Sequence, residues 1–195
     1  MELKCPYPFT LRLSICFLLL SCQIRGSFKG LTSNREELER TKPNIIESIS
    51  YNCESSNNKK SKIYIVNGHD LKFCISDYSK VLIYLWKPNC RSKACLDLEL
   101  LQNLCDSINI ELFIVAEYFD LHKMNTKYLI ERPIFGIDTY FYKTNFTKYY
   151  VSKFLTDLTG KKLSYKESLF YLFCGPTFYK EGNQIEDVVQ FAKYN

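Results

Sequence analysis

Apolar runs alternate with segments of helical periodicity along most of this chain. The continuous apolar runs predict buried strands, because a strand covered on both faces shows no polar alternation. These runs are Val81–Trp86, Ile110–Ala116 and Leu169–Phe173, with a shorter one at Ile134–Ile137. Helical spacing of apolar residues predicts helices over Arg91–Asn109, Phe146–Leu158 and Ile185–Tyr194. Strands and helices in this order indicate an α/β domain whose mixed central sheet carries helices on both faces.

An N-terminal β-hairpin is expected before the first central strand, over Lys62–Ser76. Asn67 and Gly68 form a dipeptide that is typical of tight hairpin turns, and strand-like residues flank it on both sides. In this interpretation Leu71, Phe73 and Ile75 alternate inward. Cys74 then lies on the other face as a passive side chain without an obvious partner.

Residues 1–22 have the pattern of an export signal. Lys4 and Arg12 precede the apolar run Leu13–Leu20, which is too short to span a bilayer. The run ends in Leu-Leu-Ser-Cys22, which resembles the lipobox of bacterial lipoproteins and makes Cys22 the expected lipidation site. An ordinary secretory signal or a short uncleaved anchor remains an alternative. Residues 23–60 are then a tether and N-terminal segment, and residues 61–195 are the folded domain.

Composition and charge are ordinary for a globular protein. The chain is 46% hydrophobic and 24% charged, and its net charge of +5 is spread without a basic block, which argues against a nucleic-acid partner. It carries nine cysteines. A location outside the cytoplasm would let disulfides persist.

The strongest candidate chemistry lies in VLIYLWKPNCRSKAC, where the strand ending at Trp86 leads through Pro88 to Cys90 and Cys95. A thiol at the N-terminus of the predicted helix has a lowered pKa, which Arg91 would lower further. A disulfide needs Cα atoms within about 7 Å. Residues five apart in a continuous helix lie farther apart, so the pair can form only if Cys90 lies in the loop or at the cap.

The order of elements and the W-x-x-x-C spacing of Trp86 and Cys90 resemble the thioredoxin fold. The similarity is greatest to membrane-tethered periplasmic proteins of the TlpA and ResA type and to related redoxins, and it covers about residues 60–195. PIFGID resembles the redoxin insert, and LFYLF with CGP resembles the final hairpin. The chain departs from the family in its C-x4-C spacing and in Asn89. Tyr84 stands where the family has a buried acid, and the proline before LFYLF is missing.

The resemblance implies thiol–disulfide exchange on envelope proteins that carry disulfides or thiols. Cys90 would attack a partner disulfide and Cys95 would resolve the mixed disulfide, with Trp86 and Pro88 supporting the site. The alternatives are a structural disulfide, a redox-inactive binding module, or a copper chaperone that adds His69 or His122 to the two thiolates.

No cofactor motif and no metal-ligand cluster is evident in the sequence. Glu117 and Asp120, which follow a strand, are interpreted as solvated loop carboxylates. The predicted location is the cell envelope, with the lipoprotein facing the periplasm.

Overall fold

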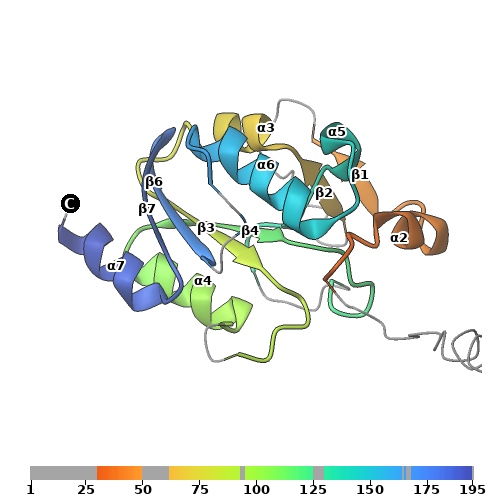
Figure 1. The fold of residues 1–195 in the computed structure, drawn as a ribbon. Helices are drawn as coiled ribbons and strands as arrows, with labels where there is room; N and C mark the ends of the chain where they lie inside the picture. The colour runs from red at the N-terminus through yellow and green to blue at the C-terminus, as the bar shows by residue number, and fades with distance from the viewer. Residues whose placement is uncertain are drawn as a thin grey trace, which may run out of the picture.

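A computed structural model describes residues 30–49, 62–92, 95–124, 130–163, 165 and 168–194. Seven strands form one sheet in the order β1-β2-β5-β4-β3-β6-β7 (Figure 1). The first five strands in that order are parallel, and β6 and β7 are antiparallel to their neighbours. The strands are β1 (Ile46–Ser48), β2 (Ile63–Val66), β3 (Val81–Trp86), β4 (Glu111–Ala116), β5 (Ile134–Ile137), β6 (Phe170–Cys174) and β7 (Thr177–Gly182).

Helices cover both faces of this sheet (Figure 1). They are α2 (Arg35–Thr41), α3 (Gly68–Cys74), α4 (Leu98–Ser107), α5 (Thr139–Tyr142), α6 (Thr147–Thr159) and α7 (Ile185–Tyr194). Residues of α4 and α7 pack in one core cluster, and residues of α3 and α6 pack in the other. The predicted α/β class and the mixed sheet with helices on both faces are therefore confirmed. Among the described residues, no helix combines the length and the apolar character needed to cross a bilayer.

The central strands lie where the apolar runs predict them. All six residues of β3 are buried, and Val81–Trp86 pairs in parallel register with Glu111–Ala116. Alternate residues of β3 and β4 face opposite layers, so Tyr84 and Trp86 pack with one cluster and Ile83 and Leu85 with the other. An apolar residue is thus required at every position of β3.

The predicted N-terminal hairpin is wrong. Ile63–Val66 is a strand, but the segment after it is helix α3. Asn67 is the N-cap of this helix: its side chain accepts a hydrogen bond from the Asp70 amide at 2.9 Å, so the Asn-Gly pair begins a helix instead of closing a turn. Leu71, Cys74 and Ile75 are buried at helical spacing, whereas Phe73 is 60% exposed.

The segment before β2 packs against the sheet. β1 pairs in parallel with β2, and Leu38 of α2 lies in the core cluster. Ser33 donates its backbone N–H to the Asn145 carbonyl at 2.9 Å, and the Phe119 N–H donates to the Ser33 carbonyl at 2.7 Å. Residues 30–38 are therefore attached both to the start of α6 and to the loop after β4.

Candidate functional site

Cys90 and Cys95 form a disulfide with a Cα–Cα distance of 6.0 Å, and both residues are partly exposed. This separation is within the range that a disulfide requires. The condition that Cys90 lie outside the helix is met, because residues 90–92 and 95–97 are not helical. The structure thus brings together the two cysteines that the sequence singles out.

The Ser92 hydroxyl lies close to both sulfurs, and the sequence does not predict Ser92 as a site residue. Its hydroxyl oxygen is 3.4 Å from Cys90 Sγ and 3.6 Å from Cys95 Sγ. A hydroxyl group can donate to a thiolate and so stabilise it. The only sequence signal for this role is the position of Ser92 between the two cysteines.

The disulfide loop is held from the side by the loop after β4. The Asn89 backbone N–H donates to the Tyr118 hydroxyl at 3.0 Å, and the Asn89 side-chain amide donates to Asp120 at 2.7 Å. Pro88 and Trp86 are buried beneath the loop, as expected for supporting residues. Asn89 therefore makes the polar contacts that fix the backbone next to Cys90.

The helix after the disulfide begins later than predicted. α4 starts at Leu98, and the Asp97 side chain caps it by accepting from the Glu99 and Leu100 amides at 3.0 and 3.1 Å. The predicted start at Arg91 is wrong, because Arg91, Ser92 and residues 95–97 are not helical and Asp97 caps the helix. The partial positive charge of the helix N-terminus lies beside Asp97 rather than Cys90.

Cys95 lies against the apolar core on the α4 side of the sheet, in the same cluster as Tyr84 and Trp86. Tyr84 belongs to the same cluster. Its side chain is fully buried, and burial raises the pKa of the Tyr84 hydroxyl to about 12. Tyr84 therefore stays neutral across the physiological pH range.

Glu117 is a buried carboxylate that the sequence analysis placed in solvent. The residue is 2% exposed, Oε2 accepts a hydrogen bond from the Tyr165 hydroxyl at 3.0 Å, and Oε1 is 3.6 Å from Lys87 Nζ. Burial raises the pKa of Glu117 to about 7, against the opposing effects of Lys87 and Tyr165. Continuing the alternation along β3 and β4 places Lys87 and Glu117 on the α6 side, opposite Cys95.

The remaining cysteines have different states. Cys74 is disulfide-bonded, which overturns its interpretation as a passive side chain; its partner is not among the described residues. Cys105 is a free, buried thiol whose pKa burial raises to about 12, and Cys174 is free and partly buried. Cys22 and Cys53, with the whole predicted signal 1–22, lie outside the described residues.

The two histidines have acidic residues as neighbours. His69 Nε2 is 3.6 Å from Asp157, and His122 lines a hollow with Asn34 and Glu37. Within the part of the chain that the structure describes, no three His, Cys, Asp or Glu side chains are grouped as metal ligands. The geometry gives the copper alternative no support.

Comparison with known protein families, with curated proteins and with solved structures found no match for this chain.

Proposed function

We propose that this chain is a thioredoxin-like protein that exchanges disulfides with other envelope proteins and is anchored in the membrane through a lipidated Cys22. The observation that carries the proposal is the partly exposed Cys90–Cys95 disulfide, which directly follows a central parallel strand. The parallel pair β3–β4, the antiparallel β6–β7 hairpin and the terminal helix α7 support the thioredoxin-like assignment. A second disulfide at Cys74 is consistent with an oxidising compartment.

The exchange balances as follows. In the reduced protein, the Cys90 thiolate attacks one sulfur of a partner disulfide, forms a mixed disulfide and releases the partner's other sulfur as a thiolate. The Cys95 thiolate then attacks Cys90 Sγ, which frees the second partner thiolate and forms the Cys90–Cys95 disulfide. The partner disulfide gains two electrons, and its two thiolates take up the protons that Cys90 and Cys95 gave up.

The groups around the loop supply part of this chemistry. The Ser92 hydroxyl is within reach of both sulfurs and can donate to whichever thiolate forms. Tyr118 and Asp120 hold Asn89 by hydrogen bonds. The backbone beside Cys90 is therefore already ordered before a partner binds, which lowers the entropic cost of positioning the Cys90 sulfur. The proton acceptor for Cys95 is solvent or the partner, because Tyr84 has a raised pKa.

A redox-inactive module with a structural disulfide is the second candidate. The start of α4 at Leu98 favours this candidate, because Cys90 then does not lie at the helix N-terminus, where the thiolate would be stabilised. The two candidates differ in the reactivity of Cys90 after mild reduction.

The test is a trapping experiment with a Cys95→Ser variant. If exchange occurs, the variant accumulates mixed disulfides with envelope proteins, which run at higher mass on a non-reducing gel and disappear on reduction. Cys174→Ser is the matched control, because Cys174 is free and partly buried, and this variant should trap nothing. If Cys95→Ser traps no partner and the Cys90 thiol alkylates no faster than a free cysteine, the exchange function is wrong.

The lipid anchor needs its own experiment. Cys22→Ser should release the protein from the membrane fraction, whereas Cys53→Ser should not. A wild-type chain that is recovered in solution without an attached lipid, by mass spectrometry, would refute the anchor.

A further inference from the structure

We propose that the face formed by Leu31, Phe146 and Tyr149, with Lys143 and Lys148 beside it, lies on the lipid bilayer surface. This inference rests on the proposed lipid anchor at Cys22. It adds an interaction surface and an orientation that the anchor alone does not determine.

The first argument is the place where the anchored end of the chain joins the domain. Gly30 packs against the Tyr118 ring, so closely that a Cβ on Gly30 would lie 2.9 Å from Tyr118 Cε1. The carbonyl of Leu31 accepts from the Thr147 amide at 3.0 Å, and Thr32 forms an antiparallel bridge with Phe146. The chain therefore meets the domain at the N-terminal end of α6.

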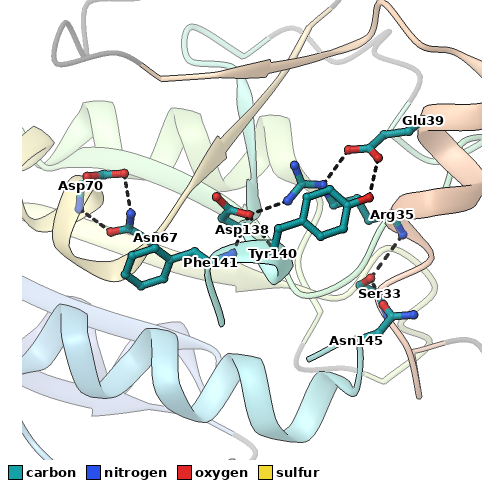
Figure 2. A network of polar contacts seen from close by, with 9 residues as sticks. All are labelled: Ser33, Arg35, Glu39, Asn67, Asp70, Asp138, Tyr140, Phe141 and Asn145. Atoms are coloured by element: carbon teal, nitrogen blue, oxygen red, sulfur yellow. Dashed lines mark hydrogen bonds and ion pairs between the residues drawn. The ribbon is translucent and has the colours of Figure 1, made fainter. Parts of the chain in front are cut away.

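A polar network fixes this junction rigidly (Figure 2). The buried Arg35 donates to Asp138 at 2.6 Å and to Glu39 at 2.8 Å, and its guanidinium lies 3.9 Å from the Tyr140 ring centroid. The Tyr140 hydroxyl in turn donates to Glu39 at 2.7 Å. The junction cannot swing relative to α5 and α6 without breaking charge-assisted hydrogen bonds.

The second argument is reach. Gly30 follows Cys22 by eight residues, and a fully extended chain of that length spans about 29 Å at most. A lipidated Cys22 lies at the bilayer surface, so the junction stays within that distance of the headgroups. The surface around the junction is therefore the part of the domain that the anchor keeps within reach of the membrane.

The third argument is the chemistry of that surface. Leu31 is 56% exposed, Phe146 is 53% exposed and Tyr149 is 59% exposed, and the rings of Phe146 and Tyr149 are in edge contact at 6.3 Å. Leu31 lies next to this ring pair along the backbone, because its carbonyl accepts from the Thr147 amide. Neighbouring exposed apolar residues of this kind mark an interaction surface. Aromatic residues with lysines beside them are typical of the membrane–water interface, where the rings enter the headgroup region and the ammonium groups meet anionic lipids.

Negative charge on the neighbouring helix α2 weakens the electrostatic attraction between this face and anionic lipids. Glu36 of α2 lines the same hollow as Lys143, whereas Lys148 lies on the exposed side of α6. The apolar side chains therefore carry the contact, and the lysines favour a bilayer with anionic headgroups.

The orientation has a consequence for the disulfide. The junction, the start of α6 and the loop after β3 all lie at the carboxyl end of the parallel strands (Figure 1). Tyr118 contacts Gly30 on one side and Asn89 on the other. The Cys90–Cys95 loop is thus held at the membrane-proximal end of the domain.

Hydroxyl-radical footprinting of the full lipidated chain in vesicles of phosphatidylethanolamine and phosphatidylglycerol tests the proposal. Insertion of an apolar face by about 5–10 Å should lower the labelling of Phe146 and Tyr149 about fivefold relative to the acyl-free mature chain in solution. Phe73 and Tyr179 are the controls, because they are 60% and 48% exposed on other parts of the surface. Their labelling should not change.

A variant distinguishes insertion from crowding by the anchor. Phe146→Ser combined with Tyr149→Ser should stay attached to vesicles but return Leu31 to the labelling rate of the free chain, whereas Phe73→Ser should leave Leu31 protected. If the wild-type chain floats with vesicles and Phe146 and Tyr149 label as fast as in solution, the surface proposal alone is overturned. If the wild-type chain does not float with vesicles, the anchor fails first and this proposal fails with it.

Discussion

The Glu117 carboxylate should make the stability of the protein fall as the pH rises toward neutrality. Burial raises its pKa in the folded state from 4.5 to about 7, although Lys87 and Tyr165 act in the opposite direction. Between these two values the folded chain holds a proton that the unfolded chain has released. The stabilisation is therefore complete below the unfolded pKa and is lost as the pH rises through the folded pKa.

The expected size follows from the shift. A difference between 4.5 and about 7 corresponds to about 3 kcal/mol in the free energy of unfolding at 1.36 kcal/mol per unit. Glu117→Gln removes the titration and keeps the shape of the side chain. The free-energy difference between variant and wild type should therefore shift by about 3 kcal/mol in favour of the variant between pH 4 and pH 8.

The assay is urea unfolding at a series of pH values with the disulfides intact. Comparing the two proteins at each pH cancels the titration of every other group. Glu186→Gln is the matched control, because it makes the same substitution at an exposed position on α7. A difference between Glu117→Gln and wild type that stays constant from pH 4 to pH 8 would refute the buried titration.

Three further variants test the structure. Asp97→Ala removes the cap of α4 and should lower the free energy of unfolding by about 1 kcal/mol, measured by urea unfolding. Arg35→Met removes the charge-assisted hydrogen bonds to Asp138 and Glu39 and should cost about 3 kcal/mol, visible as a lowered melting temperature, whereas a value under 1 kcal/mol would contradict the network. Gly68→Ala places a Cβ 2.5 Å from the Phe154 carbonyl oxygen, so it should shift α3 from α6 and lower the melting temperature. The decrease should be larger than for Gly160→Ala, where the added Cβ would lie 4.0 Å from Lys72 Nζ and the positive φ of 71° is the main cost.

The central strands and the later helices could be predicted because burial on both faces leaves an unambiguous sequence pattern. β3 has no polar residue, and α7 spans the predicted Ile185–Tyr194. α6 ends where Gly160 provides the left-handed C-cap with a φ of 71°. In β3, α6 and α7 the secondary structure favoured by the local sequence is also the one that buries the apolar residues in the folded protein.

The hairpin was mispredicted because Asn67-Gly68 is compatible with two structures. Asparagine and glycine favour tight turns, but asparagine is also among the strongest helix N-caps. The residues that follow fit either a period of two through Leu71, Phe73 and Ile75 or a helical spacing through Leu71, Cys74 and Ile75. Only packing against α6 decides between them, and Gly68 lies in contact with the Phe154 carbonyl there.

Glu117 could have been found from the register of two strands. Trp86 pairs with Ala116, so the residues that follow them, Lys87 and Glu117, are neighbours across the parallel pair. Glu117 also continues the inward alternation of Phe113 and Val115. A lysine and a glutamate in this relation predict an ion pair at the strand ends. The prediction of a solvated carboxylate was wrong because it assumed that every carboxylate in a loop is exposed.

The position at which α4 starts and the disulfide between Cys90 and Cys95 are related. A continuous helix through both cysteines would hold the Cα atoms of Cys90 and Cys95 at about 8–9 Å, which excludes the observed 6.0 Å and hence the disulfide. The helix that follows the disulfide is capped by Asp97. A Cys90 thiolate must then be stabilised by the Ser92 hydroxyl and the exposed Arg91 instead of the helix N-terminus. Ser92→Ala should therefore slow alkylation of Cys90 in the reduced protein, whereas Asp97→Ala should leave the alkylation rate unchanged.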